Sequence, residues 1–120
     1  MTTDRRRRAN RRGRGAETLA AGILRLKGYR ILARGFRVPT GEIDIVAARG
    51  RTIAFVEVKA RESRTAALDA VGFQQRGRIV RAAEHFLSQH AGLRGHDLRF
   101  DVIAIVPGRL PEHIADAWRP

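Results

Sequence analysis

The stretch GEIDIVAARGRTIAFVEVK, residues 41–59, decides the fold because it has the pattern of a β-hairpin. Gly50 and Arg51 separate two runs that are rich in β-branched residues. Glycine at the first central position suits a two-residue type II′ turn. With that turn Arg49 faces Thr52, and this pair fixes the register of the whole hairpin.

Three carboxylates and one lysine lie at the open end of the hairpin in this register. Asp44 lies directly opposite Glu57, and Glu42 lies directly opposite Lys59. Side chains alternate between faces along a strand, so all four share one face. The other face carries only apolar residues, namely Ile43, Ile45, Ala47, Ala54, Val56 and Val58.

Acids that face each other across two strands need an explanation. Like charges in that position are destabilising, and apolar residues on both faces predict a central hairpin whose carboxylates are partly desolvated. A divalent cation bound by carboxylate and backbone oxygens would resolve the conflict. Alternatively Lys59 neutralises one acid, as an ion pair with Glu42, and water solvates the others. The hairpin alone leaves both readings open.

The composition favours an anionic partner. The chain of 120 residues has a formal net charge of +12, and residues 1–14, MTTDRRRRANRRGR, contribute +6 of it. This Arg-rich tail lacks the apolar residues of a core, so we predict that it is disordered and suited to gripping phosphates. Only two of the 24 basic residues are lysines, and a base-composition bias of the genome would also produce that skew.

The sequence excludes several other classes. It has no cysteine, so disulfides and thiolate metal sites are absent. No apolar run approaches the ~20 residues of a membrane span, and Arg25 and Lys27 interrupt the apolar segment that a secretory signal would need. We therefore expect a cytoplasmic protein with no membrane partner.

A first helix is predicted over residues 16–27, with Gly28 as its terminator. Its apolar stripe comprises Ala16, Leu19, Ala20, Ile23, Leu24 and Leu26. Glu17 falls at the edge of the stripe, where it could face a site at the sheet end. An acid in a first helical turn is also favoured by the helix dipole alone.

A second helix is predicted from about residue 73 to residue 89. Its buried face is marked by Ile79, Ala82, Ala83 and Phe86, which recur at helical spacing. Gln75 lies one turn before Ile79 on the same face. The helix therefore aims Gln75 toward the sheet.

The remaining elements complete a single α/β domain over residues 15–120, with a mixed sheet whose core is the hairpin. Strands are predicted over 29–38, along both arms of the hairpin and over 98–106, and a loop with a short helical turn over 60–72. A last short helix is predicted over 111–118, with Trp118 packing back onto the body. The element order is thus α-β-β-β-α-β plus that helix, with helices flanking the sheet.

Asp44 and the triplet Glu57-Val58-Lys59 resemble the active-site signature of the PD-(D/E)XK nuclease superfamily, which includes restriction endonucleases and Holliday-junction resolvases. The ordered blocks are similar to those of the YraN-type family of small bacterial proteins within that superfamily. They are GAETLAAGILRLKGYRILARGFR, GEIDIVA, FVEVKAR, RIVRAAEHFL and RFDVIAI. The resemblance implies a restriction-endonuclease-like fold over roughly residues 15–118.

The resemblance also implies a metal-dependent mechanism. Asp44, Glu57 and the backbone carbonyl of Val58 would bind Mg²⁺ or Mn²⁺, and Lys59 would orient a water and stabilise developing charge.

The resemblance further implies that two flanking side chains complete the site. Glu17 and Gln75 stand in the places of those groups. Glu42 could hold a second metal or pair with Lys59. Gln75 occupies a position where many relatives are expected to carry lysine, so it removes a positive charge near the scissile phosphate.

Three functions follow as hypotheses. The first is a metal-dependent nuclease on DNA, of branched or single-stranded form, with DNA preferred to RNA as the partner. The second is an adaptor that keeps the fold and binds nucleic acid without cutting it. The third is a protein-interaction scaffold whose charge is incidental. One small domain has few surfaces for gripping both strands of a duplex, so we also expect a homodimer.

Asp101 lies inside the predicted last strand, and we assign it a structural role, paired with Arg30 or Arg99. The four histidines have no metal-binding spacing and are expected at the surface or in packing.

Overall fold

The computed structural model of the chain describes residues 15–120. The predicted Arg-rich tail, residues 1–14, lies outside the described residues. A helix covers residues 15–26, and it precedes the remaining elements. These are β1 (Arg30–Val38), β2 (Gly41–Arg49), β3 (Thr52–Ala60), α2 (Arg64–Asp69), α3 (Phe73–Ser88), a 3-10 helix (Ala91–Leu93), β4 (Asp97–Ile105) and β5 (Glu112–Trp118).

The five strands form one mixed sheet in the order β1-β2-β3-β4-β5. Neighbouring strands are antiparallel except β3 and β4, which are parallel. Parallel neighbours need a crossover connection, and here α2 and α3 supply it. The predicted α/β domain with a mixed sheet and flanking helices is confirmed.

The register of the β2–β3 hairpin is the one that the turn predicts. Arg49 pairs with Thr52, and Ile45 pairs with Val56. Gly50 has a φ of +60°, whereas the φ of Arg51 is not positive. Positive φ at the first central position alone is the signature of a type II′ turn.

The β2–β3 ladder stops one residue before the acids. Its last pair is Ile45 with Val56, and beyond it the Asp44 carboxylate accepts a hydrogen bond from the backbone N–H of Val58 at 2.8 Å. Strict alternation of faces also breaks here, because Ile43 packs in the core cluster on the α3 side. The prediction that Ile43 shares a face with Ile45 is therefore wrong.

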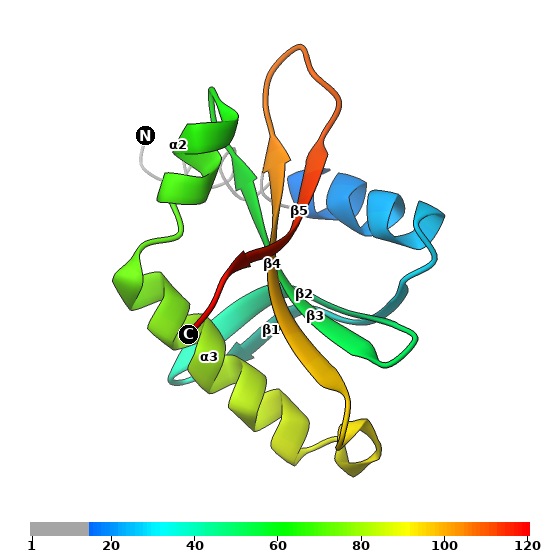
Figure 1. Ribbon diagram of the computed structural model, residues 1–120. Helices are drawn as coiled ribbons and strands as arrows, with labels where there is room; N and C mark the ends of the chain where they lie inside the picture. Colours follow the sequence, from blue (N-terminus) through cyan, green and yellow to red (C-terminus); the bar gives the residue numbers. More distant parts are fainter. Residues whose placement is uncertain (1–14) are drawn as a thin grey trace.

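Helices cover both faces of the sheet (Figure 1). The face of α3 that the sequence marks is the one that packs on the sheet, with Ile79, Ala82, Ala83 and Phe86 all buried. The helix over 15–26 packs on the other face. At Gly41 of β2, α3 comes so close that a Cβ atom would overlap the backbone carbonyl of Arg78. Only glycine leaves room for this contact.

The buried stripe of the first helix differs in part from the predicted one. Ala20, Ala21 and Leu24 are buried against the sheet, whereas Leu19 and Leu26 are exposed. The small alanine side chains form the helix surface that meets the sheet. Leu19 and Leu26 lie outside this surface and remain exposed to solvent.

The predicted helix over 111–118 is wrong, because this segment is β5. It pairs with the free edge of β4, for example through Ile114 and Val102. Strand pairing and packing outweigh local helix propensity here. Trp118 is buried and its ring lies 4.4 Å from that of Phe100, so its packing onto the body is confirmed.

None of the helices in residues 15–120 combines the length and the apolar character that crossing a membrane requires.

Candidate functional site

Four of the predicted site residues come together where β2, β3 and the beginning of α3 meet. Asp44 lies on β2, Glu57 and Lys59 on β3, and Gln75 in the first turn of α3. The hairpin turn fixes the two strands in register. The crossover between the parallel strands brings α3 back over the same sheet end.

Glu57 is the centre of this group. Its side chain is only 7% exposed. The Gln75 amide donates a hydrogen bond to Glu57 Oε1 at 2.9 Å, and Lys59 Nζ lies 3.6 Å from the same oxygen. The prediction that α3 aims Gln75 toward the sheet is confirmed.

The surroundings of Glu57 raise its pKa from 4.5 to about 9. Burial is the largest cause, because it penalises the charged form. The charge of Asp44 and a hydrogen bond between the two carboxyl groups raise the pKa further, and Lys59 offsets part of the rise. At neutral pH Glu57 therefore keeps its proton.

The backbone around Val58 is arranged for a ligand on the β2 side. The N–H of Val58 points at Asp44 rather than into the β4 ladder. The N–H and C=O of one strand residue point to the same edge, as in a pair that exchanges both bonds. The Val58 carbonyl therefore points toward the side of Asp44, where the ladder has already stopped.

Glu42 and Glu17 are both held by arginines of β1. Glu42 forms an ion pair with Arg37 at 3.2 Å, and Glu17 forms one with Arg34 at 3.1 Å. Within residues 15–120, no hydrogen bond or ion pair joins either acid to Asp44, Glu57, Lys59 or Gln75. The alternative ion pair of Glu42 with Lys59 is therefore wrong.

Sequence reasoning missed these arginine partners. For Arg37 a signal existed, since the Pro39–Gly41 turn makes it the direct cross-strand neighbour of Glu42. For Arg34 no short-range signal existed, because its contact with Glu17 depends on where the first helix lies on the sheet.

The donor set at this site fits a hard divalent cation. In the part of the chain that the structure describes, no three His, Asp or Glu side chains are grouped so as to hold a metal. Mg²⁺ commonly uses only one or two protein carboxylates and completes its shell with water and substrate phosphate. Two adjoining carboxyl groups beside a backbone carbonyl match this preference.

A second buried acid, Asp101, is fully inaccessible to solvent. It accepts two hydrogen bonds from Arg99 and one each from the His113 ring and the Asp116 backbone. Burial alone would raise its pKa, but these hydrogen bonds outweigh burial and lower the pKa to about 2. The predicted pairing with Arg99 and the structural role are supported, whereas the His113 contact had no sequence signal.

Comparison with known proteins places the chain in a bacterial family. The model of the uncharacterised protein family UPF0102 matches residues 16–105. Proteins named for that family match nearly the whole chain. One from Parvibaculum lavamentivorans is 54% identical over 93% of this chain and 84% of its own length. Others from Maricaulis maris and Agrobacterium fabrum are 50% and 49% identical, over 96% and 97% of this chain and 91% and 95% of theirs.

Proposed function

The chain belongs to the uncharacterised protein family UPF0102, and we propose that it is a divalent-metal-dependent nuclease of the PD-(D/E)XK superfamily that hydrolyses phosphodiester bonds in DNA. One observation carries the proposal. Glu57, with its pKa raised to about 9, lies beside Asp44, and its side chain is almost inaccessible to solvent. Such a pair is costly to keep for stability alone, whereas a cation that displaces the proton of Glu57 makes use of it.

Asp44, Glu57 and the Val58 carbonyl would hold Mg²⁺ or Mn²⁺. Such an ion, when bound, polarises a phosphate oxygen and lowers the pKa of a coordinated water. Asp44 has a second task, because its carboxylate also holds the Val58 N–H at 2.8 Å. This contact fixes the orientation of Asp44 relative to the Val58 carbonyl.

Lys59 supplies the positive charge of the site. The Lys59 side chain is 13% exposed. Its ammonium group has three N–H donors, and the Glu57 carboxyl group engages one side of it. The remaining donors can hold a water in line with a phosphate and stabilise negative charge as it develops there. Because Lys59 and Glu57 lie on the same face of β3, they would act on one phosphate.

Gln75 orients Glu57 without neutralising it. The amide keeps the carboxyl group turned toward Asp44 and Lys59, as the 2.9 Å hydrogen bond indicates. Glu17 stays a predicted member of the site, and Glu42 stays outside the proposed metal ligands because Arg37 engages it.

The test is cleavage by the full chain. Branched, nicked, linear and single-stranded DNA, and RNA, are incubated with Mg²⁺ or Mn²⁺. We expect cleavage of DNA that Asp44→Asn and Glu57→Gln abolish, because each variant keeps the shape and removes a carboxyl group that could ionise to bind the metal. Glu17→Gln in the same assay tests the role predicted for that residue. Glu62→Gln, an exposed acid just after β3, is the matched control and should cleave normally.

A second readout does not depend on cleavage. Binding of Mn²⁺ should raise the thermal midpoint of the wild type and of Glu62→Gln, but not of Glu57→Gln. Absence of both cleavage and Mn²⁺ stabilisation would overturn the proposal. Salt-sensitive DNA binding that survives Glu57→Gln, without cleavage, would establish the adaptor function instead. The homodimer stays a prediction, which sedimentation of the full chain tests.

A further inference from the structure

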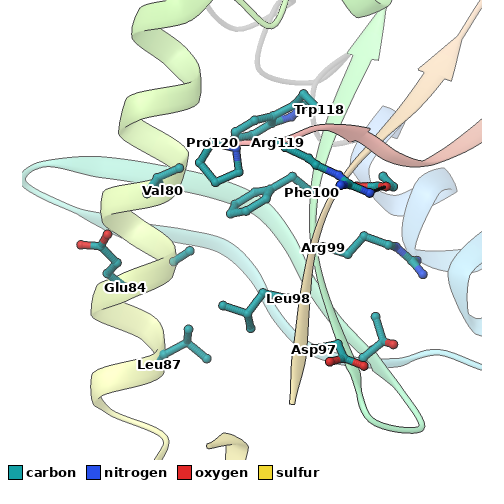
Figure 2. A pocket seen from close by; sticks show the side chains of 13 residues that line it. Val80, Glu84, Leu87, Asp97, Leu98, Arg99, Phe100, Trp118, Arg119 and Pro120 are labelled. Atoms are coloured by element: carbon teal, nitrogen blue, oxygen red, sulfur yellow. Dashed lines mark hydrogen bonds and ion pairs between the residues drawn. The ribbon is translucent and has the colours of Figure 1, made fainter. Parts of the chain in front are cut away.

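A continuous groove runs between α3 and β5, on the face of the sheet that α3 covers. Three adjoining hollows, of about 660, 670 and 490 Å³, all have Trp118 in their walls. Figure 2 shows one of them, with Val80 and Leu87 of α3 facing Leu98 and Phe100 of β4. Neighbouring hollows also share other lining residues, Phe73 and Arg76 in one case and Val80 and Arg119 in the other.

The middle part of the groove is positively charged. Its walls include Arg76, Arg78, Arg81 and Arg119, and no acidic residue lines it. Arg76 stacks over the Trp118 ring at 5.4 Å. Arg78 makes no side-chain hydrogen bond or ion pair with any other residue in the range 15–120. Arg119 is already paired with Asp116 at 2.8 Å. Arg76 and Arg78 would bind an anion, and the apolar walls between them favour one that also has flat apolar faces.

An exposed aromatic ring stands at one end of the groove. Phe73, the first residue of α3, is 93% exposed, yet it lines two of the three hollows. Burial of this ring in the core would have been favourable. A ring kept in solvent beside arginines forms a stacking platform for an unpaired base.

One end of the groove lies one strand away from Glu57. Val102 lines the hollow at the Phe73 end, and Val102 is the ladder partner of Glu57 in the β3–β4 pairing. Phe73 lies two residues before Gln75, so the two side chains leave α3 on different sides of the helix. The groove therefore ends near the acids at Val102, and neither Asp44 nor Glu57 lines its hollows.

We propose that the α3–β5 groove binds a single strand of nucleic acid, with an unpaired base on Phe73 and phosphates on Arg76 and Arg78. A duplex keeps its base faces stacked inside, so it offers phosphates to the arginines but nothing to Phe73. The proposal rests on the proposed function only in holding that the bound strand is the one presented to Asp44 and Glu57. Binding itself needs no catalysis.

Trp118 provides the measurement, because it is the only tryptophan of the chain and lies in the groove. The full chain is titrated in EDTA with a single-stranded thymidine oligonucleotide, with a blunt duplex of equal length and with polyphosphate. We expect a saturable change of Trp118 fluorescence with the single strand, at a lower ligand concentration than with the duplex or with polyphosphate.

Matched variants separate the base contact from the phosphate contact. Phe73→Ala should weaken single-strand binding about fivefold or more, whereas Leu110→Ala, which removes an equally exposed apolar side chain, should not change it. Arg78→Ala should weaken binding and lower the salt slope by about one, whereas Arg25→Ala, an exposed arginine on the opposite side of the sheet, should not.

These outcomes test strand binding by the groove independently of the proposed nuclease activity. Equal response to polyphosphate or duplex, or an unchanged affinity in Phe73→Ala, overturns the groove even if the protein cleaves DNA. A single-strand response that needs Phe73 and Arg78 supports the groove even if no cleavage is found. Failure of Asp44→Asn to affect cleavage would count against the proposed function and leave this titration untouched.

Discussion

Gln75 of α3 donates its side-chain amide to Glu57 of β3 at 2.9 Å, so a neutral group holds the most strongly perturbed acid of the sheet. A lysine at the same place would hold the acid and also compensate its charge. The difference between the two is measurable, because it acts on the protonation of Glu57.

Gln75→Lys should lower the pKa of Glu57 below about 9, because an added positive charge beside a buried carboxylate favours its ionised form. The acid limb of the cleavage profile, or the pH at which Mn²⁺ binds, should then move to lower pH. Gln74→Lys, at the neighbouring exposed position, is the control. An equal shift in both variants would mean that general charge, and not this contact, sets the pKa.

The stability of the metal-free protein should fall as pH rises from about 5 to 9. Folded Glu57 keeps its proton up to about pH 9, whereas the unfolded chain loses it near pH 4.5, so the unfolded state binds fewer protons in between. Denaturant unfolding in EDTA at several pH values measures this. Glu57→Gln should flatten the dependence, and a slope that is the same in the variant would contradict the assignment.

Asp101 affects stability in a different pH range, because its pKa is lowered from 3.8 to about 2. Its contribution is complete above pH 4 and is lost as pH falls toward 2. Asp101→Asn should cost about 3 kcal/mol or more at pH 7, because Arg99 loses its partner in a buried place. Glu112→Gln, which breaks the exposed pair with Arg64, should change the free energy of unfolding by about 1 kcal/mol or less.

Two glycine substitutions should change the free energy of unfolding in opposite directions. Gly41→Ala should destabilise the protein by about 1–3 kcal/mol, because the new methyl group meets the Arg78 carbonyl and pushes α3 off β2. Gly22→Ala, in the helix over 15–26, meets nothing within 4 Å and should stabilise by about 0.5–1 kcal/mol. Chemical denaturation of the two variants checks the pair, and equal effects would contradict the packing at Gly41.

Much of the fold could be predicted from local sequence patterns, namely turn type and the spacing of apolar residues. Gly50 selects the turn and thereby the register of the hairpin, so the approach of Asp44 and Glu57 could be predicted. The helical spacing of the apolar residues of α3 gave its buried face and the direction of Gln75. Each of these inferences spans fewer than about twenty residues, within which periodicity and turn type decide the structure.

The errors concern contacts between distant parts of the chain. The segment over 112–118 becomes a strand because β4 presents a free edge to it, and no residue within the segment signals that edge. Leu26 looks apolar and periodic, yet the sheet does not reach it. Arg34 and Arg37 of β1 engage Glu17 and Glu42, and the pair of Glu42 with Arg37 replaces the alternative pair with Lys59.

The early end of the β2–β3 ladder has a consequence for how the protein folds. Asp44 and Val58 are separated by 14 residues, and Glu57 and Gln75 by 18, so these contacts can form locally and fast. The parallel partner β4 arrives only after the crossover closes. We expect Glu57 to be less buried until β4 docks beside it, because Val102 of β4 is its ladder partner and burial is the largest cause of its raised pKa. The electrostatic penalty of bringing the acids together is therefore met late, at the step that docks β4.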